Sequence, residues 1–277
     1  MGAIIWLASY PKSGNTWIRA FLHNLLRNPE RPADINTLDR FTLGDAQGAW
    51  FEIVSGRPWG DLSDEEIAKL RPRVHERMTR SFPDSVFVKT HCVLGEFKEV
   101  PQITMEHTGG AIYILRSPFD VAISMSHQFG LDIDNAISWM ADPDFVAARD
   151  PETGLVPHAI NSWSNHVKSW TRVEHDTLHV VRYEDLHQHP AKFFRGIAEF
   201  LGLQPPRERL KRAIRHSSFK VLRGQEDKHG FVERSVHAER FFRQGKMGVW
   251  RKILTPGQVE RVVKAHGEQM ERFGYLP

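Results

Sequence analysis

Four short apolar runs, separated by stretches with helical spacing, are the feature that most limits what this chain can fold into. Each run is rich in β-branched or aromatic residues, which is typical of buried strands. The runs are Ala3–Ala8, Val86–Thr90, Ala111–Leu115 and Leu178–Arg182. Because strands that alternate with helices form parallel sheets covered on both faces, we expect an α/β fold of three layers, with a central, mostly parallel sheet flanked by helices.

The helices are expected between these strands and after the last of them. Helical spacing predicts them, together with Pro190 at one helix start and Gly202 after its end. Their ranges are Thr16–Leu26, Pro118–Phe129, His158–Val173, Ala191–Leu201 and Pro256–Phe273. No internal repeat or linker interrupts the pattern, so we expect a single domain over residues 1–277.

Three stretches are expected to be irregular, namely residues 38–59, 132–157 and 224–246. The second is rich in Asp, Pro and Gly, and the third is polar with few large aliphatic side chains. Long loops in an α/β enzyme usually bind substrate or close over it, although solvated insertions without such a role have the same composition. We interpret these stretches as substrate or lid segments.

Charge and cysteine content exclude several classes of protein. The formal net charge is +3 and the isoelectric point about 9.0, and no block of five like charges occurs. This mild excess of positive charge suits a small anionic ligand at least as well as a nucleic acid, and a basic arm for DNA or RNA is absent. The single cysteine, Cys92, excludes an intrachain disulfide and a zinc site built on paired cysteines. The apolar residues 1–8 lack a basic flank, and no run of 18 apolar residues occurs. We expect a cytoplasmic protein with no nucleic-acid partner and no membrane partner.

A loop suited to phosphate follows the first strand. The segment Tyr10–Trp17 leads from that strand into a helix, where free backbone N–H groups and the helix dipole favour an anion. Lys12 adds a positive charge and Thr16 a hydroxyl. In the nucleotide-binding pattern G-x-x-x-x-G-K-[ST], the lysine would stand where Asn15 stands, whereas here it has moved three residues earlier. The pattern therefore argues against a triphosphate and favours a ligand with a single 5′-phosphate group.

This loop carries the first resemblance to a known family. Tyr-Pro-Lys-Ser-Gly-Asn-Thr-Trp is similar to the 5′-phosphosulfate loop of sulfotransferases that use 3′-phosphoadenosine 5′-phosphosulfate (PAPS), in which Thr is common at the position of Asn15. The resemblance implies a P-loop-like fold, PAPS as sulfuryl donor and the desulfated nucleotide PAP as product. The residues that it places on the donor are Lys12, Ser13, Gly14, Asn15, Thr16 and Trp17.

A second phosphate motif follows the third strand. Arg116 stands at the strand end and Ser124 eight residues later in the next helix, so their side chains can converge on one phosphate. This pair resembles the family's 3′-phosphate motif. The segment Phe241–Trp250 resembles its R-K-G-x-x-G-x-W segment, which implies that Arg243, Gln244 and Gly245 close on the same phosphate. Gln244 replaces the usual Lys, and Val249 replaces a common Asp.

Two short motifs resemble the family's adenine-binding segments. Tyr183 begins Tyr-Glu-Asp-Leu at the end of the fourth strand, and Ser217 and Phe219 belong to His-Ser-Ser-Phe. The resemblance implies that these three residues lie near the base. Trp17 and Phe219 are suited to holding a flat ring between them, although each aromatic residue taken singly is as compatible with the core.

The reacting groups are expected at the end of the second strand. Lys89 and His91 are two residues apart, so on an extended chain they share a face beside the phosphate loop. The Lys-Thr-His sequence resembles that of cytosolic sulfotransferases and implies that His91 is the catalytic base, with Lys12 and Lys89 stabilising charge. No acidic cluster is spaced for Mg²⁺, so we expect no metal. Cys92 as a nucleophile is disfavoured because no further base is available to it.

The acceptor remains open at this stage. We expect a small molecule with a hydroxyl group, bound by aromatic side chains of 38–59 and 132–157, and a phenol, an apolar alcohol, a sugar and a peptide natural product all fit. The opening residues 4–12 also resemble bacterial sulfotransferases that modify glycopeptide-type natural products. A small-molecule or nucleotide kinase, and a protein that binds nucleic acid or a lipid surface, are the alternatives.

A last motif concerns assembly. Arg251, Thr255 and Glu260 match the family's dimer segment K-x-x-x-T-V-x-x-x-E, but Pro256 stands where a backbone N–H would be needed. We therefore expect no dimer through this segment.

Overall fold

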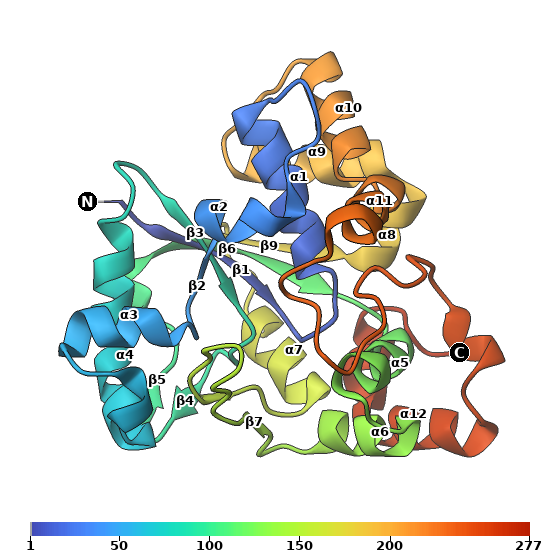
Figure 1. Ribbon diagram of the computed structural model, residues 1–277. Helices are drawn as coiled ribbons and strands as arrows, with labels where there is room; N and C mark the ends of the chain where they lie inside the picture. The colour runs from blue at the N-terminus through green and yellow to red at the C-terminus, as the bar shows by residue number, and fades with distance from the viewer. Residues whose placement is uncertain (1) are drawn as a thin grey trace.

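A five-stranded parallel sheet lies between two layers of helices in the computed structural model, which describes residues 2–277 (Figure 1). The strand order is β2-β3-β1-β6-β9, and every neighbouring pair is parallel. The pairs β4·β5 and β7·β8 are separate and antiparallel. The strands are β1 Ile4–Ser9, β2 Leu43–Gly44, β3 Val86–Thr90, β4 Glu96–Phe97, β5 Val100–Pro101, β6 Thr108–Leu115, β7 Val146–Ala147, β8 His158–Ala159 and β9 Leu178–Arg182.

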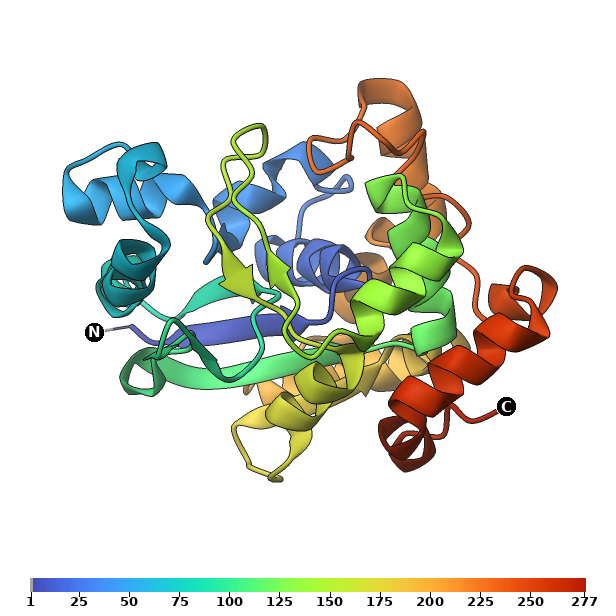
Figure 2. The same cartoon turned by 90° about the horizontal axis from the view of Figure 1, so that it is seen from below.

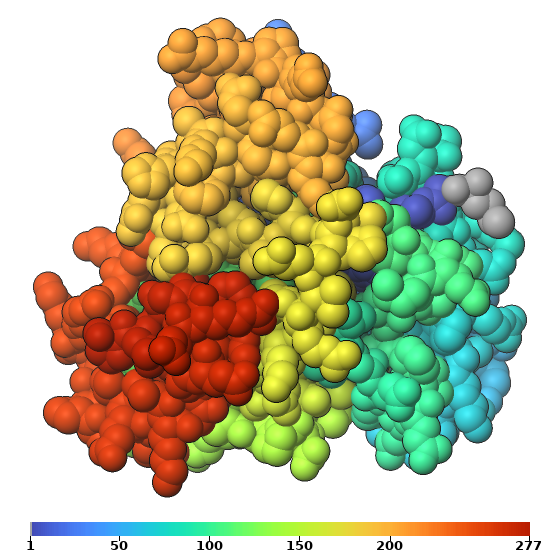
Figure 3. All heavy atoms as spheres, turned by 180° about the vertical axis from the view of Figure 1, so that it is seen from behind, coloured from blue at the N-terminus to red at the C-terminus, as the bar shows by residue number. Residues whose placement is uncertain are grey.

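The helices connect and cover these strands. They are α1 Asn15–Arg27, α2 Leu38–Phe41, α3 Gly48–Ser55, α4 Asp64–Thr79, α5 Pro118–Phe129, α6 Ile133–Ala141, α7 Trp163–Thr171, α8 Tyr183–Gln188, α9 Pro190–Phe200, α10 Arg207–His216, α11 Phe219–His229 and α12 Pro256–Arg272. Seen from behind, α12 covers part of the surface next to the α7 region (Figure 3). No described helix is both long and apolar enough to cross a membrane.

The central strand β1 shows why both faces of the sheet are covered. Its side chains alternate, so Ile4 and Trp6 pack with α4, α5, α6, α7 and α12 on one face. Leu7 points the other way and packs with α1, α9 and α10. A strand that is apolar on both sides has to be buried on both sides, and this arrangement confirms the predicted three-layer α/β architecture.

The predicted elements are found in place, with small shifts at their ends. The four predicted strands are β1, β3, β6 and β9, and α5 has the predicted bounds. The helix predicted over His158–Val173 begins later, at Trp163, which is a correction. His158 and Ala159 instead pair with β7, and the Ser162 side chain accepts a hydrogen bond from the backbone N–H of Asn165 and so caps the helix.

The prediction that 38–59, 132–157 and 224–246 are irregular was wrong in part. Helix α3 lies in the first, α6 in the second, and α11 runs into the third. Helix α6 begins where Asp132 accepts a hydrogen bond from the N–H of Asn135 at 2.6 Å, and it buries Ala136, Ile137 and Met140 at helical spacing. A short capped helix fits in a segment whose Asp, Pro and Gly content is typical of a loop. The rest of this segment projects from the sheet as the β7·β8 pair (Figure 2).

Candidate active site

Four predicted site residues lie where neighbouring strands of the sheet end. Lys12 follows β1, His91 follows β3, Arg116 follows β6 and Tyr183 follows β9. These strands are adjacent and parallel, so their carboxyl ends meet at one edge. Ligands of open α/β sheets bind at that edge.

The phosphate loop has the backbone of an anion cradle. Gly14 caps α1 at φ 107°, and the N–H groups of Trp17 and Ile18 bond to its carbonyl oxygen. The N–H groups of Gly14, Asn15 and Thr16 therefore precede the hydrogen-bond ladder of the helix and face the loop. The hydroxyl of Ser13 is buried and has no hydrogen-bond partner among residues 2–277, which suits a group that awaits a ligand oxygen.

Gly14 cannot carry a side chain. A Cβ atom there would lie 2.7 Å from a ring carbon of Tyr183, and the φ angle is one that residues with side chains rarely adopt. The phosphate loop and Tyr183 therefore touch directly.

The side chain of Asn15 serves the strand instead of the cradle. Its amide donates to the carbonyl oxygen of Leu7 at 2.8 Å and to the hydroxyl of Ser9 at 3.3 Å. Its backbone N–H is therefore the donor that remains for a ligand.

Lys12 is a cation whose charge is weakly compensated. Its Nζ donates to Gln128 Oε1 at 2.8 Å and lies 3.9 Å from the centre of the Phe241 ring. Burial, followed by the charges of Arg116 and Lys89, lowers the pKa of the Lys12 ammonium to about 7. An anion that entered here would stabilise the charged form, as expected for a phosphate site.

His91 is held in one tautomer. Its Nδ1 lies 2.8 Å from the carbonyl oxygen of Ser9. Because a carbonyl oxygen only accepts, Nδ1 carries the proton, and Nε2 is the free base of the neutral ring. Burial, followed by the charge of Lys89, lowers the pKa of the His91 imidazole well below its ordinary value, so the ring is neutral at pH 7. The backbone of His91 is also held, because its carbonyl oxygen lies 3.2 Å from Nε2 of the buried His166.

Beneath the Lys-Thr-His segment lies a buried polar network. Asp45 Oδ2 accepts from Thr90 Oγ1 at 2.8 Å and from Cys92 Sγ at 3.2 Å, and it pairs with Arg71 at 3.4 Å. Burial raises the pKa of the Cys92 thiol, which keeps it protonated and unsuited to attack as a nucleophile.

Two guanidinium groups, those of Arg116 and Arg243, were predicted to bind the second phosphate. Arg116 donates to the carbonyl oxygen of Lys12 at 2.9 Å, lies over the Tyr183 ring and keeps a buried Nε–H without a partner in the described chain. Burial, followed by the charge of Arg116, lowers the pKa of the Arg243 guanidinium. The two positive charges therefore act on each other, and an anion bound nearby would favour the charged form of both. Ser124 lies half-buried on α5.

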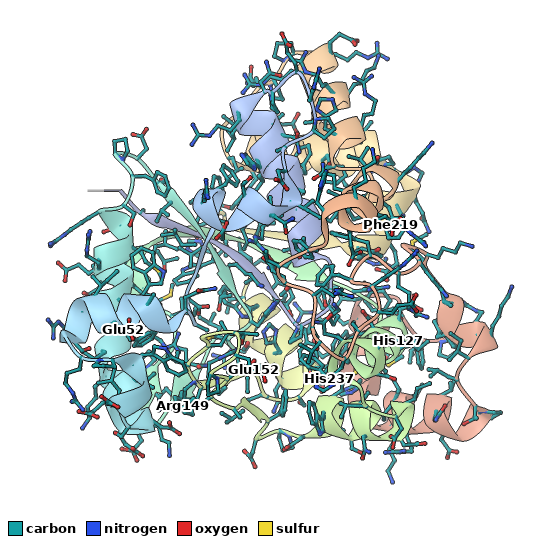
Figure 4. All side chains as sticks on the ribbon, in the orientation of Figure 1. Glu52, His127, Arg149, Glu152, Phe219 and His237 are labelled. Atoms are coloured by element: carbon teal, nitrogen blue, oxygen red, sulfur yellow. The ribbon has the colours of Figure 1, made fainter. Side chains whose placement is uncertain are left out.

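The segment that carries Arg243 is fastened to α5 and α11. Asp120 accepts from the N–H groups of Gly248 at 2.7 Å and of Trp250 at 3.2 Å. Gly245 packs so closely on Phe219 that a Cβ atom would lie 2.3 Å from the ring. Figure 4 shows Phe219 at the start of α11, with His127 on α5. Gln244 stands between Arg243 and Gly245 in this segment, and its role at a phosphate stays a prediction.

The predicted adenine residues come together only in part. Trp17 and Phe219 are partly buried on the rim of one apolar cluster, and the Trp17 ring meets that of Tyr183 edge-on at 5.5 Å. Ser217 is fully buried, and its hydroxyl donates to the carbonyl oxygen of Ala213 at 2.9 Å, within its own helix.

Comparison with known proteins decides the family. A family profile described as sulfotransferase domain matches residues 4–274. The chain belongs to the sulfotransferase family. It is 27% identical to sulfotransferase 1B1 of Canis lupus familiaris over 272 residues, which cover 96% of this chain and 83% of that relative. It is 26% identical to sulfotransferase 2B1 of Homo sapiens over 278 residues, which cover 99% of this chain and 67% of that relative.

Solved structures of sulfotransferases and related proteins share the fold. Mouse sulfotransferase SULT7A1, solved with PAP, aligns with a TM-score of 0.62 at 21% identity, over 97% of this chain and 84% of that chain. Retinol dehydratase, solved with androsterone and the inactive cofactor PAP, aligns with a TM-score of 0.65 at 19% identity, over 97% and 80%. This likeness confirms the predicted P-loop-like fold.

Several carboxylates that organise the sulfotransferase site were missed in the sequence. Glu184 accepts from the N–H of Ser117 at 3.0 Å, and Glu226 accepts from the N–H groups of Phe241 and Phe242. Asp120 has a similar role, and Glu233 pairs with Lys89 at 3.3 Å. Each of these carboxylates contacts residues that are not its neighbours in the sequence, so no local residue spacing predicts the contact. Within residues 2–277, no three His, Cys, Asp or Glu side chains are arranged to hold a metal ion.

Proposed function

We propose that this sulfotransferase moves the sulfuryl group of PAPS to a hydroxyl group of a small molecule, giving PAP and a sulfate ester. The observation that carries the proposal is the gathering of Lys12, Lys89, Arg116 and the free base His91 at the carboxyl edge of the sheet. The orphaned donors Ser13 Oγ and Arg116 Nε fit a bound phosphate at each end of the donor. Sulfotransferase SULT7A1 and retinol dehydratase were each solved with PAP, which supports the same donor here.

The reaction is an in-line displacement in which each residue has a defined task. His91 Nε2 takes the proton of the acceptor hydroxyl while its oxygen bonds to sulfur. The bond from sulfur to the 5′-phosphate oxygen breaks, and PAP leaves with its electron pair. Lys12 and the N–H groups of the loop stabilise the charge that grows on that oxygen, and Lys89 neutralises the sulfuryl oxygens. Arg116 and Arg243, with Ser124, hold the 3′-phosphate.

This chemistry requires no metal, because the leaving group is a stabilised phosphate anion and lysines supply the positive charge. We propose further that the protein is cytoplasmic and that its acceptor is an aromatic or apolar alcohol. Retinol dehydratase has been solved with androsterone and with retinol, which supports an acceptor of this kind. Trp59, Trp139 and Phe145 pack on the same apolar cluster and supply aromatic surface for it.

A thermal-shift experiment tests the donor. Stabilisation follows RT ln(1 + [L]/Kd), so PAP at about 100 times its Kd should add roughly 2.7 kcal/mol. AMP, which lacks the 3′-phosphate, should stabilise far less, and ATP–Mg²⁺ and an oligonucleotide should have little effect. Turnover with PAPS should survive EDTA. A larger shift with ATP–Mg²⁺ than with PAP, or turnover that EDTA abolishes and Mg²⁺ restores, would contradict the proposal in favour of a kinase.

A further inference from the structure

Glu233, in the 224–246 segment, lies at the cation cluster, and the proposed reaction assigns it no task. Its carboxylate bridges two cations that come from different elements. Oε1 lies 2.5 Å from Nη1 of Arg19, on α1, and Oε2 lies 3.3 Å from Nζ of Lys89, at the end of β3. One carboxylate thus joins the 224–246 segment to the helix behind the phosphate loop and to the strand that carries the base.

The two halves of this bridge differ in how firmly they are held. The Arg19 side chain is only 2% exposed, and the carboxylate of Glu233 compensates its buried positive charge. Removing such a partner is costly, so the Arg19 contact is an anchor. The Lys89 side chain is 28% exposed and can exchange partners more easily. The carboxylate is therefore fixed from behind and presents its second oxygen to Lys89.

The charge of Glu233 also acts on the rest of the cluster. Burial alone would raise the pKa of the Glu233 carboxyl, but Lys89 and Arg19 outweigh burial and hold it at about 2. The ion is thus charged at every working pH. The charged groups that face Lys12 are Arg116 and Lys89, which lower its pKa, and Glu233 and Glu226, which raise it.

We propose that Glu233 is a positioning residue of the sulfotransferase site, anchored on Arg19 and holding the Lys89 ammonium where the sulfuryl group is transferred. The inference rests on the proposed function and deepens it. It links the placement of Lys89 to the position of the 224–246 segment, because the carboxylate that contacts the lysine belongs to that segment. The negative charge of Glu233 also raises the pKa of Lys12, which favours its protonated form before the anionic donor binds.

Kinetics of Glu233→Gln test the role. Removing the charge while keeping the shape should lower kcat about tenfold or more, with PAP affinity changed less than about threefold, since Lys89 faces the transferred group and not the nucleotide. The alkaline limb of kcat/KM should move to lower pH, because a lysine that loses an anionic neighbour loses its proton sooner. Glu233→Asp, which keeps the charge on a shorter side chain, should recover part of kcat. The matched control is Glu239→Gln, an exposed residue of the same segment, and it should behave as wild type.

A second measurement does not depend on turnover. NMR titration of ¹³C-labelled lysine side chains in the ligand-free protein should place the Lys12 midpoint near 7 in the wild-type protein and clearly lower in Glu233→Gln. A wild-type kcat and pH profile in Glu233→Gln, in an enzyme that transfers sulfuryl groups from PAPS, would overturn the positioning role and leave the proposed function intact. If the wild-type protein showed no PAPS-dependent transfer but the Lys12 pKa still fell in Glu233→Gln, the proposed function would be overturned. Glu233 would then remain the charge that raises the pKa of Lys12.

Discussion

The proposed donor side and the proposed acceptor side of this site are built in different ways. On the donor side, Lys12, Arg116 and Tyr183 follow the ends of adjacent strands, and their places are set by the crossovers of the parallel sheet. On the proposed acceptor side, short elements of 38–62 and 142–160 are held to one another by side chains and by a few backbone hydrogen bonds. The positions of the proposed donor-binding residues are therefore set by the sheet. The proposed acceptor side depends instead on a few contacts between short segments.

Arg149 shows how the acceptor side is held. Its guanidinium donates to the carbonyl oxygens of Trp59 at 2.9 Å and Leu62 at 2.6 Å, and it pairs with Asp64 at the start of α4. Figure 4 shows it beside α4. A backbone bond from the N–H of Gly48 to the carbonyl oxygen of Gly154 ties the same two segments together. None of these bonds joins two strands of the central sheet.

The largest effect is expected where the two sides meet, at His91. His91→Ala removes the base, which acts only as the transition state forms, so turnover should fall by about 10²–10⁴ while PAP affinity stays within a few-fold. Single-turnover rates and PAP titrations on both proteins measure this. A variant that retained most of its turnover would place the base elsewhere.

A smaller effect, confined to the donor, is expected at Arg116. Charge-assisted hydrogen bonds to the 3′-phosphate contribute about 1.5–3 kcal/mol each, so Arg116→Ala should weaken PAPS by roughly 10- to 100-fold. The variant should also lose the preference for PAP over AMP, because that preference comes from the 3′-phosphate. Calorimetric titration with both nucleotides measures it, and an unchanged preference would contradict the assignment.

The smallest effect, confined to the acceptor, is expected at Arg149. Arg149→Ala removes hydrogen bonds worth about 0.5–1.5 kcal/mol each, which corresponds to an acceptor KM raised about 3- to 10-fold. PAP affinity should not change, because no donor contact is lost. Arg80→Ala, which breaks a surface pair with Glu76, is the control. If Arg149→Ala weakened PAP as much as the acceptor, the two sides would not be separable.

The sequence predicts these two sides unequally, and for a physical reason. The phosphate loop is local, because its cation, glycine and helix start lie within Lys12–Thr16, so adjacent residues determine its shape. Short elements held by distant contacts are harder to predict, and α6 was expected to be a loop. Glu233 lies 214 positions from Arg19 and 144 positions from Lys89 in the sequence. The residues next to Glu233 in the sequence therefore do not indicate either ion pair.

Arg71 and Asp45 illustrate the same limit within the core. Arg71 is 1% exposed in the middle of α4, where a charged residue would be expected to face solvent. Its partner Asp45 is in the segment expected to be irregular, and the pair is recognisable only once the chain has folded. The Ser63–Glu66 capping box, by contrast, is a local signal that would have located the start of α4.

His166, the imidazole that contacts the backbone of His91, makes the stability of the fold depend on pH. His166 is fully buried, and burial lowers its pKa from the ordinary value of 6.5 to about 3. Between about pH 3 and pH 6.5, His166 therefore binds a proton in the unfolded chain but not in the folded chain. The resulting stability is complete above pH 6.5, falls as the pH drops toward 3, and amounts to about 5 kcal/mol over that window. Burial, followed by the charge of Lys89, also lowers the pKa of His91, so acid strong enough to protonate the proposed base also destabilises the folded protein.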